Sequence, residues 1–119
     1  MDASPEFGGI RFGPRPKPLL LSALAGCAGI DVASIMRKKQ VPFTDFQIVV
    51  TGETTDSHPK YYKTILMVFE VTGENFEGNP AIYEKVLRAV ELSSENYCGV
   101  SAMLKLAAEI THEIRLINA

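Results

Sequence analysis

The sequence predicts one α+β domain in which a long buried helix packs on an antiparallel β-sheet. Three patterns lead to this prediction. An apolar helical pattern covers residues 19–39, alternation of apolar and polar residues covers 46–51 and 64–71, and an amphipathic helical pattern begins at Pro80. At 119 residues the chain has the length of one ordinary domain, which can bury a core without disulfide or metal staples.

Residues 1–18 are predicted to be an extended lead-in, and residues 19–119 to be the folded domain. The lead-in holds four of the seven prolines, which are unfavourable in helices and central strands. The first helix then continues to about Lys39, before Pro42 prevents any extension. Because both sides of this helix are apolar, we expect it to be buried nearly all round.

Two strands and a second helix are expected next. The polar stretch Gly52–Lys60 separates the alternating segments and is predicted to be an exposed hairpin loop. Asn79 and Pro80 favour a helix start, because asparagine caps free amides and proline already holds a helical φ. The predicted buried stripe of this helix is Ile82, Val86, Ala89, Val90, Ser93 and Tyr97. A short helix is expected over 100–105 and a last strand over 110–116.

The charge balance argues against a nucleic-acid partner. Twelve Lys and Arg face 14 Asp and Glu, which gives a formal net charge of −2. This leaves no basic excess to neutralise phosphates. Hydrophobic residues make up 46% of the chain, and such a surplus in a small domain suggests an oligomer.

The apolar run at residues 19–30 follows three basic residues, as a signal peptide would, and residues 24–27 resemble a lipoprotein cleavage box. Ser22 and Asp31 interrupt the apolar pattern, however, and it falls short of ~18 uncharged apolar residues. We therefore expect a cytoplasmic protein without a membrane span. The alternative is an exported lipoprotein whose mature chain begins at Cys27.

Cys27 and Cys98 are the candidate functional residues. A cysteine pair in a reducing compartment is more often catalytic, redox-sensing or metal-binding than a structural bridge. Gly26 and Gly29 flank Cys27, and each costs a helix about 1 kcal/mol, so they indicate close packing or access to the sulfur. Cys98 lies at a break between helices, where the next helix start favours a thiolate. Either cysteine could instead be a small core residue.

A metal site would require the two cysteines to converge with His58 and His112. No pair among these four residues has the short spacing of zinc motifs, so we expect no metal. The glycines form no phosphate-binding loop, and we expect no other cofactor.

Two segments resemble the OsmC/Ohr family. They are Pro16–Cys27 (PKPLLLSALAGC) and Tyr97–Ser101 (YCGVS), and the resemblance covers about residues 8–118. It implies an intertwined α+β homodimer whose central helices are buried between sheets. It also implies a thiol-dependent peroxidase for hydrophobic organic hydroperoxides, in which Cys27 attacks the peroxide, Cys98 resolves the product and a dithiol reductant restores the pair.

The chain departs from the family pattern near the first cysteine. The best-studied members carry a glutamate ten residues before it, which orients the thiolate together with an arginine from an upstream hairpin. Here that position is Lys17, and Arg11 and Arg15 are nearby cations outside any matching motif. A cation at Lys17 would itself favour a thiolate. The alternative function is therefore a non-enzymatic OsmC-like protein that binds a small apolar ligand or acts as a redox sensor.

Overall fold

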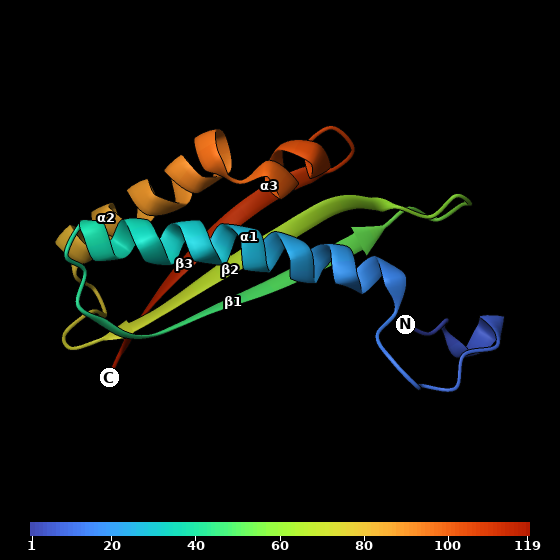
Figure 1. The fold of residues 1–119 in the computed structure, drawn as a ribbon. Coiled ribbons are helices and arrows are strands. Elements are labelled where there is room, and N and C mark those ends of the chain that lie inside the picture. Colours follow the sequence, from blue (N-terminus) through green and yellow to red (C-terminus); the bar gives the residue numbers. More distant parts are fainter.

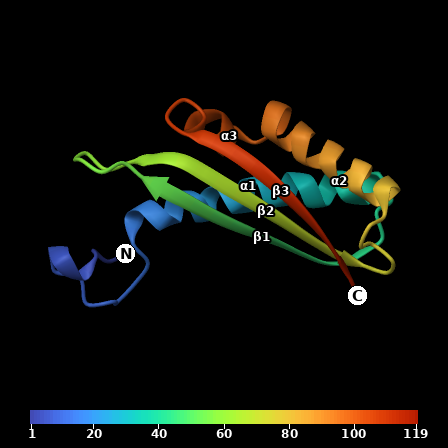
Figure 2. The ribbon, with the colours of Figure 1, turned by 180° about the vertical axis from the view of Figure 1, so that it is seen from behind.

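The computed structural model describes residues 1–119 and confirms the α+β class. A 3-10 turn, η1, comes first. The elements in chain order are η1 (Pro5–Phe7), α1 (Pro16–Lys38), β1 (Phe43–Thr54), β2 (Tyr62–Gly73), α2 (Pro80–Leu92), the π-helical turn η2 (Ser93–Tyr97), α3 (Gly99–Leu104) and β3 (Glu109–Asn118). The long helix α1 crosses the sheet, and α2 and α3 lie on the same side of it (Figures 1 and 2).

The sheet is mixed, with the strand order β1-β2-β3. The antiparallel pairing expected from the sequence holds for β1 and β2, where Ile48 lies opposite Phe69. β3 instead runs parallel to β2, with His112 opposite Met67. The reason is the long connection through residues 74–108, whose helices return the chain to the same end of the sheet, as parallel pairing requires.

The inner face of the central strand β2 forms the floor of the core. Successive side chains of a strand point to opposite faces, so every second residue meets the helices. These inward residues are Ile65, Met67, Phe69 and Val71, each at most 1% exposed. All three strands extend beyond the predicted alternating segments, because backbone pairing continues where the alternation of side chains stops.

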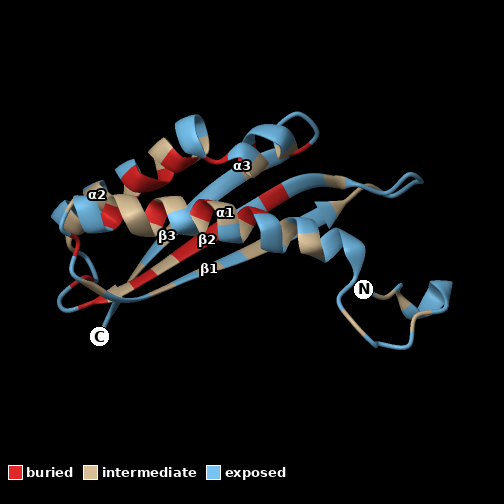
Figure 3. Cartoon of the chain, in the orientation of Figure 1, coloured by how far each residue is buried: buried red, intermediate tan, exposed pale blue.

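Helix α1 is buried along one stripe only, which corrects the expectation of burial all round (Figure 3). The stripe repeats every fourth residue and consists of Leu24, Ala28, Val32 and Met36. A single sheet face covers only one side of the helix, so Ile30 on another side is 74% exposed. Gly29 permits a close approach to β1, because a Cβ there would lie 3.2 Å from Cδ1 of Ile48, whereas a Cβ at Gly26 would meet nothing within 4 Å.

By length and composition alone, α1 could cross a membrane. Its most apolar 18-residue window has a mean hydropathy of 1.9. Core helices of globular domains pass the same test, and α1 packs against the sheet and against α2.

Helix α1 begins at Pro16, three residues before the predicted start, because proline is well tolerated in a first helical turn.

Helix α2 begins as predicted. The Asn79 side chain accepts hydrogen bonds from the amides of Ala81 and Ile82, and Pro80 occupies the first turn. Val86, Ala89, Val90 and Ser93 are buried as expected. Tyr97 is 63% exposed, which corrects its predicted place in the stripe. The π-helical turn η2 adds a residue to the last turn and rotates this side chain away from the core.

We predict that Val71→Ala and Val49→Ala will have clearly different effects on stability. Val71 is 0% exposed on the inner face of β2, and Val49 is 46% exposed on β1. Both changes carry the same loss of strand propensity, but only Val71→Ala leaves a cavity. We expect Val71→Ala to lower the free energy of unfolding by about 2–3 kcal/mol and Val49→Ala by less than about 1 kcal/mol. Urea denaturation monitored by circular dichroism measures both, and equal losses would contradict the packing described here.

Candidate functional site

The structure brings Cys27 and Cys98 together, although 70 residues lie between them in the chain. Cys27 lies in the middle of α1, and Cys98 lies between η2 and α3. Their two sulfurs and a carboxylate oxygen of Asp31 all lie within 4.8 Å of one another. Both cysteines are free thiols, with Cys27 half-buried and Cys98 only 3% exposed. Of the two sulfurs, Cys27 is therefore the one more accessible to a small molecule.

The π-helical turn positions Cys98. Its backbone N–H donates to the carbonyl of Ser93 at 2.8 Å, five residues back, which ends the second helix. Cys98 then adopts an extended backbone and caps α3, with its sulfur accepting from the N–H of Ser101 at 3.4 Å. Lys105 Nζ donates to the carbonyl and the hydroxyl of Ser94 at 2.7 and 2.9 Å. These bonds tie the two ends of the Cys98 segment together.

The surroundings of Cys98 favour its protonated form. Burial raises the pKa of the Cys98 thiol, and the neighbouring Cys27 and the negative charge of Asp31 raise it further. The Ser101 amide lowers the pKa, as predicted for a sulfur at a helix start, but burial outweighs this effect. Cys98 is thus a thiol rather than a thiolate at neutral pH.

Asp31 is part of this site, although the sequence analysis assigned it no role there. It lies four residues after Cys27, on the same face of α1, and is the only acidic residue of that helix. Its Oδ2 accepts a hydrogen bond from the hydroxyl of Ser93 at 3.2 Å, and it forms no ion pair. The signal in the sequence was the single acidic residue in the apolar middle of the helix, one turn from a cysteine.

Behind Cys98 lies a small cavity of about 10 Å³, enough for roughly one water molecule. Its lining residues are Ala28, Met67, Phe69, Val90, Ser93, Ser94, Cys98, Ser101 and His112. The Ser101 hydroxyl is buried without a hydrogen-bond partner.

The ring of His112 lies 6.0 Å from that of Phe69. The pKa of His112 is lowered, mainly by burial and further by the positive charge of Lys105. His112 shares this cavity with Cys98, whereas His58 is in the β1–β2 loop.

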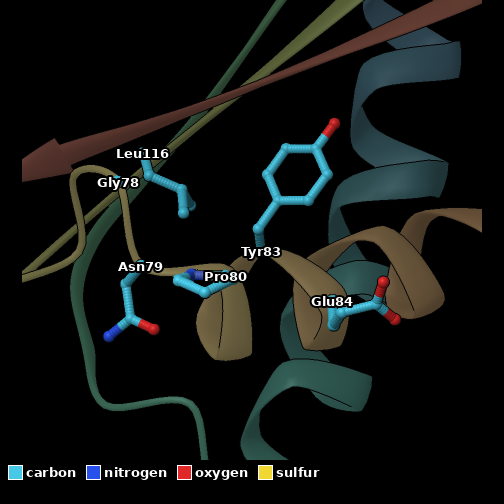
Figure 4. A pocket seen from close by; sticks show the side chains of 6 residues that line it. All are labelled: Gly78, Asn79, Pro80, Tyr83, Glu84 and Leu116. Carbon is cyan, nitrogen blue, oxygen red and sulfur yellow. The ribbon is translucent and has the colours of Figure 1, made fainter.

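Two of the larger grooves that open at the surface are lined by residues of α2. One, of about 450 Å³, begins at Asp31 and is lined by Ile35, Leu92 and Tyr97 together with Ser34, Lys38 and Lys39. It is open to solvent and reaches Asp31, which lies beside the two thiols, but neither cysteine lines it. The other, of about 460 Å³, lies where Tyr83 of α2 faces Leu116 of β3 (Figure 4). No cysteine or histidine lines this second groove, so it offers no nucleophile.

The other candidate residues are not brought into the site. Lys17 is in the first turn of α1, about 15 Å along the helix axis from Cys27. This exceeds the screening length of about 8 Å at physiological ionic strength, so Lys17 has little influence on Cys27 within one chain. Arg15 immediately precedes the helix, and Arg11 belongs to the lead-in. The groups of this site that can act chemically are therefore two thiols and one carboxylate, with the His112 imidazole on the wall of the cavity behind Cys98.

Comparisons with known proteins agree with this architecture. The sequence model of OsmC-like proteins matches residues 7–113. Protein YhfA of Escherichia coli K12 is 36% identical over 106 residues, which cover 89% of this chain and 75% of YhfA.

Solved structures give the same result. A hypothetical protein from Aquifex aeolicus superimposes with a TM-score of 0.80 at 30% identity, over 93% of this chain and 79% of that one. The organic hydroperoxide resistance protein OsmC from Legionella pneumophila shares the fold at 16% identity, with a TM-score of 0.69 over 97% of this chain and 79% of that one. The match to the family sequence model and the identity to YhfA show that the chain belongs to the OsmC-like protein family.

Proposed function

We propose that this protein is a thiol-dependent peroxidase that reduces hydrophobic organic hydroperoxides with Cys27 and Cys98. The observation that best supports the proposal is the pairing of a half-buried and a buried free thiol whose sulfurs lie within 4.8 Å. A disulfide needs a sulfur separation of about 2.05 Å, so the two must approach by at most about 3 Å. Relatives named for organic hydroperoxide resistance share this fold.

Cys27 takes the first step, because its sulfur is the more exposed. The Cys27 thiolate attacks the terminal oxygen of the hydroperoxide, the O–O bond breaks, and the alkoxide leaves and is protonated to the alcohol. Cys27 is now a sulfenic acid. Cys98 then attacks this sulfur and loses its proton, and the sulfenic hydroxyl accepts a proton and departs as water. The product is a Cys27–Cys98 disulfide.

The raised pKa of Cys98 suits the resolving role. A buried, protonated thiol does not compete for the peroxide, and it reacts once a sulfenic acid forms beside it. The Ser101 amide that contacts its sulfur can stabilise negative charge as the proton leaves. The different burial of the two cysteines thus supports the attacking role for Cys27 and the resolving role for Cys98.

The surroundings favour an apolar substrate. Ile35, Leu92 and Tyr97 line the apolar part of the groove at Asp31, and we propose that the hydrocarbon part of the substrate packs on these side chains with its hydroperoxide group directed toward the thiols. The reaction leaves an oxidised pair, so a dithiol reductant must restore both thiols by exchange. We also propose a cytoplasmic location, because a reducing compartment keeps such a thiol pair available for reaction.

We also propose that the protein is a homodimer. One side of the long apolar helix α1 is uncovered in the single chain, where Leu20 and Ile30 are 46% and 74% exposed. Exposed apolar surface of this kind is typical of a contact between subunits. A second copy over this side of α1 would also reduce the exposure of Cys27 to bulk water.

A non-enzymatic role is the second candidate, as a redox sensor or a binder of small apolar ligands. It is favoured by one observation: Lys17 occupies the position of the activating glutamate and lies far from Cys27 within the chain. A thiol pair without an activating group would still form a disulfide slowly, and that is sufficient for sensing.

The peroxidase proposal predicts different defects for the two cysteine variants. With cumene hydroperoxide and a dithiol reductant, we expect steady-state turnover by the wild type and only the uncatalysed rate for Cys27→Ser, because the attacking sulfur is lost. Cys98→Ser should consume one equivalent of hydroperoxide and then stop, with a Cys27 sulfenic acid that a dimedone probe labels.

Ser22→Ala is the matched control, because Ser22 is exposed on α1 and lies outside the site. It should turn over at the wild-type rate. Equal, negligible rates in the wild type and both cysteine variants would rule out the enzyme and leave the sensor.

The dimer proposal predicts a particle of twice 13.0 kDa in size-exclusion chromatography with light scattering. Ile30→Glu should yield a 13.0 kDa particle, because a buried carboxylate would be unpaired at the contact. Val49→Glu, on the opposite face of the sheet, should remain dimeric. A wild-type particle of 13.0 kDa, or an unchanged mass for Ile30→Glu, would contradict the proposed contact.

A further inference from the structure

The geometry points to a binding site for a soft divalent cation such as Zn²⁺, formed by Cys27, Asp31 and Cys98. Each residue offers one ligand atom, and the two sulfurs and the carboxylate oxygen all lie within 4.8 Å of one another. Around a tetrahedral zinc with Zn–S of about 2.3 Å and Zn–O of about 2.0–2.2 Å, such atoms are roughly 3.5–3.8 Å apart. The three groups therefore need to close by only about 1 Å.

The backbone presents these ligands from two sides. Cys27 and Asp31 are four residues apart on α1, the spacing at which a helix offers two ligands to one metal ion. Cys98 comes from the break between η2 and α3, which packs against α1. In zinc motifs, two cysteines close together in the chain usually supply one pair of ligands. Here a cysteine and an aspartate one helical turn apart would supply that pair.

Both thiols could ionise together here only beside a cation. Two thiolates and a carboxylate in a half-buried site would repel one another, and no basic side chain is paired with Asp31. Lys105 is the basic residue tied to the Cys98 segment, and its amino group is bound to Ser94 instead. A divalent ion is therefore the group that would let both thiols ionise together.

The surrounding hydrogen bonds fit the same role. The buried hydroxyl of Ser93 donates to Oδ2 of Asp31 at 3.2 Å, which leaves Oδ1 free for a metal and fixes the carboxylate. Three protein ligands leave a fourth position of a tetrahedral ion open. The groove that begins at Asp31 leads to this side of the site, so a water molecule can complete the coordination.

Metal binding and disulfide formation exclude each other at this site. Both use the same two sulfurs, and a disulfide has no thiolate to donate. The ion would therefore protect the reduced pair from oxidation, and two-electron oxidation of the pair would release the ion. The site itself requires only reduced thiols, so the inference does not depend on the peroxidase proposal.

Titration of the reduced, metal-free full-length protein with Co²⁺ and then Zn²⁺ tests the inference. We expect one ion per chain, thiolate-to-cobalt charge-transfer absorption, and the strong visible bands of tetrahedral cobalt, all displaced by Zn²⁺. Cys27→Ser and Cys98→Ser should each lose the charge-transfer absorption or most of the affinity. Asp31→Asn should weaken zinc binding by at least the roughly 10–100-fold that is typical even for the outer partners of metal ligands.

The controls separate this site from others on the chain. Asp45→Asn on β1 and His58→Ala in the β1–β2 loop should bind Zn²⁺ like the wild type. The wild type, once oxidised to its Cys27–Cys98 disulfide, should bind no Zn²⁺. This comparison needs no substitution that could disturb folding. No binding by the reduced wild type, a wild-type affinity for Asp31→Asn, or half an ion per chain would overturn the site. Hydroperoxide turnover is measured separately, so a failed activity assay leaves the zinc result standing.

Discussion

The packing of α1 on β2 is the constraint on which the site depends. One residue per turn of the helix is buried against the sheet, and Ala28 and Val32 belong to that stripe. Cys27 and Asp31 each precede one of these residues, so they lie about 100° round the helix from the stripe. They therefore face the neighbouring segment that connects α2 to α3 rather than the sheet, and both remain partly exposed. A rotation of α1 by one residue would bury Cys27 against the sheet and separate it from Cys98.

The second half of the site depends on how α2 ends. A regular α-helix through Tyr97 would have continued the apolar stripe, but the π-helical turn breaks the hydrogen-bond pattern and frees Cys98 to cap α3. The same change turns Tyr97 outward, where it lines the groove at Asp31. One local irregularity thus positions both the buried sulfur and part of the surface that leads to it. π-helical turns of this kind are frequent at functional sites.

Much of the fold could be predicted because each element carries a local signal. The period of the apolar residues, the Asn79–Pro80 cap and the loop prolines are properties of short segments. The features that were missed depend on contacts between segments. The direction of β3 follows from the path of residues 74–108, and the one-sided burial of α1 follows from the number of layers that cover it. Likewise, both cysteines were identified, but Asp31 became part of the site only once its neighbours in space were known.

We propose that Cys27 and Cys98 form one functional pair within a single chain. Peptide mapping by mass spectrometry, after one equivalent of cumene hydroperoxide is added to the reduced wild type, tests it most directly. We expect a Cys27–Cys98 disulfide to accumulate within the chain at the expense of both free thiols. Cys27 oxidised to a sulfinic acid beside an unmodified Cys98 would contradict it, because a sulfenic acid within 4.8 Å of a thiol should be captured first.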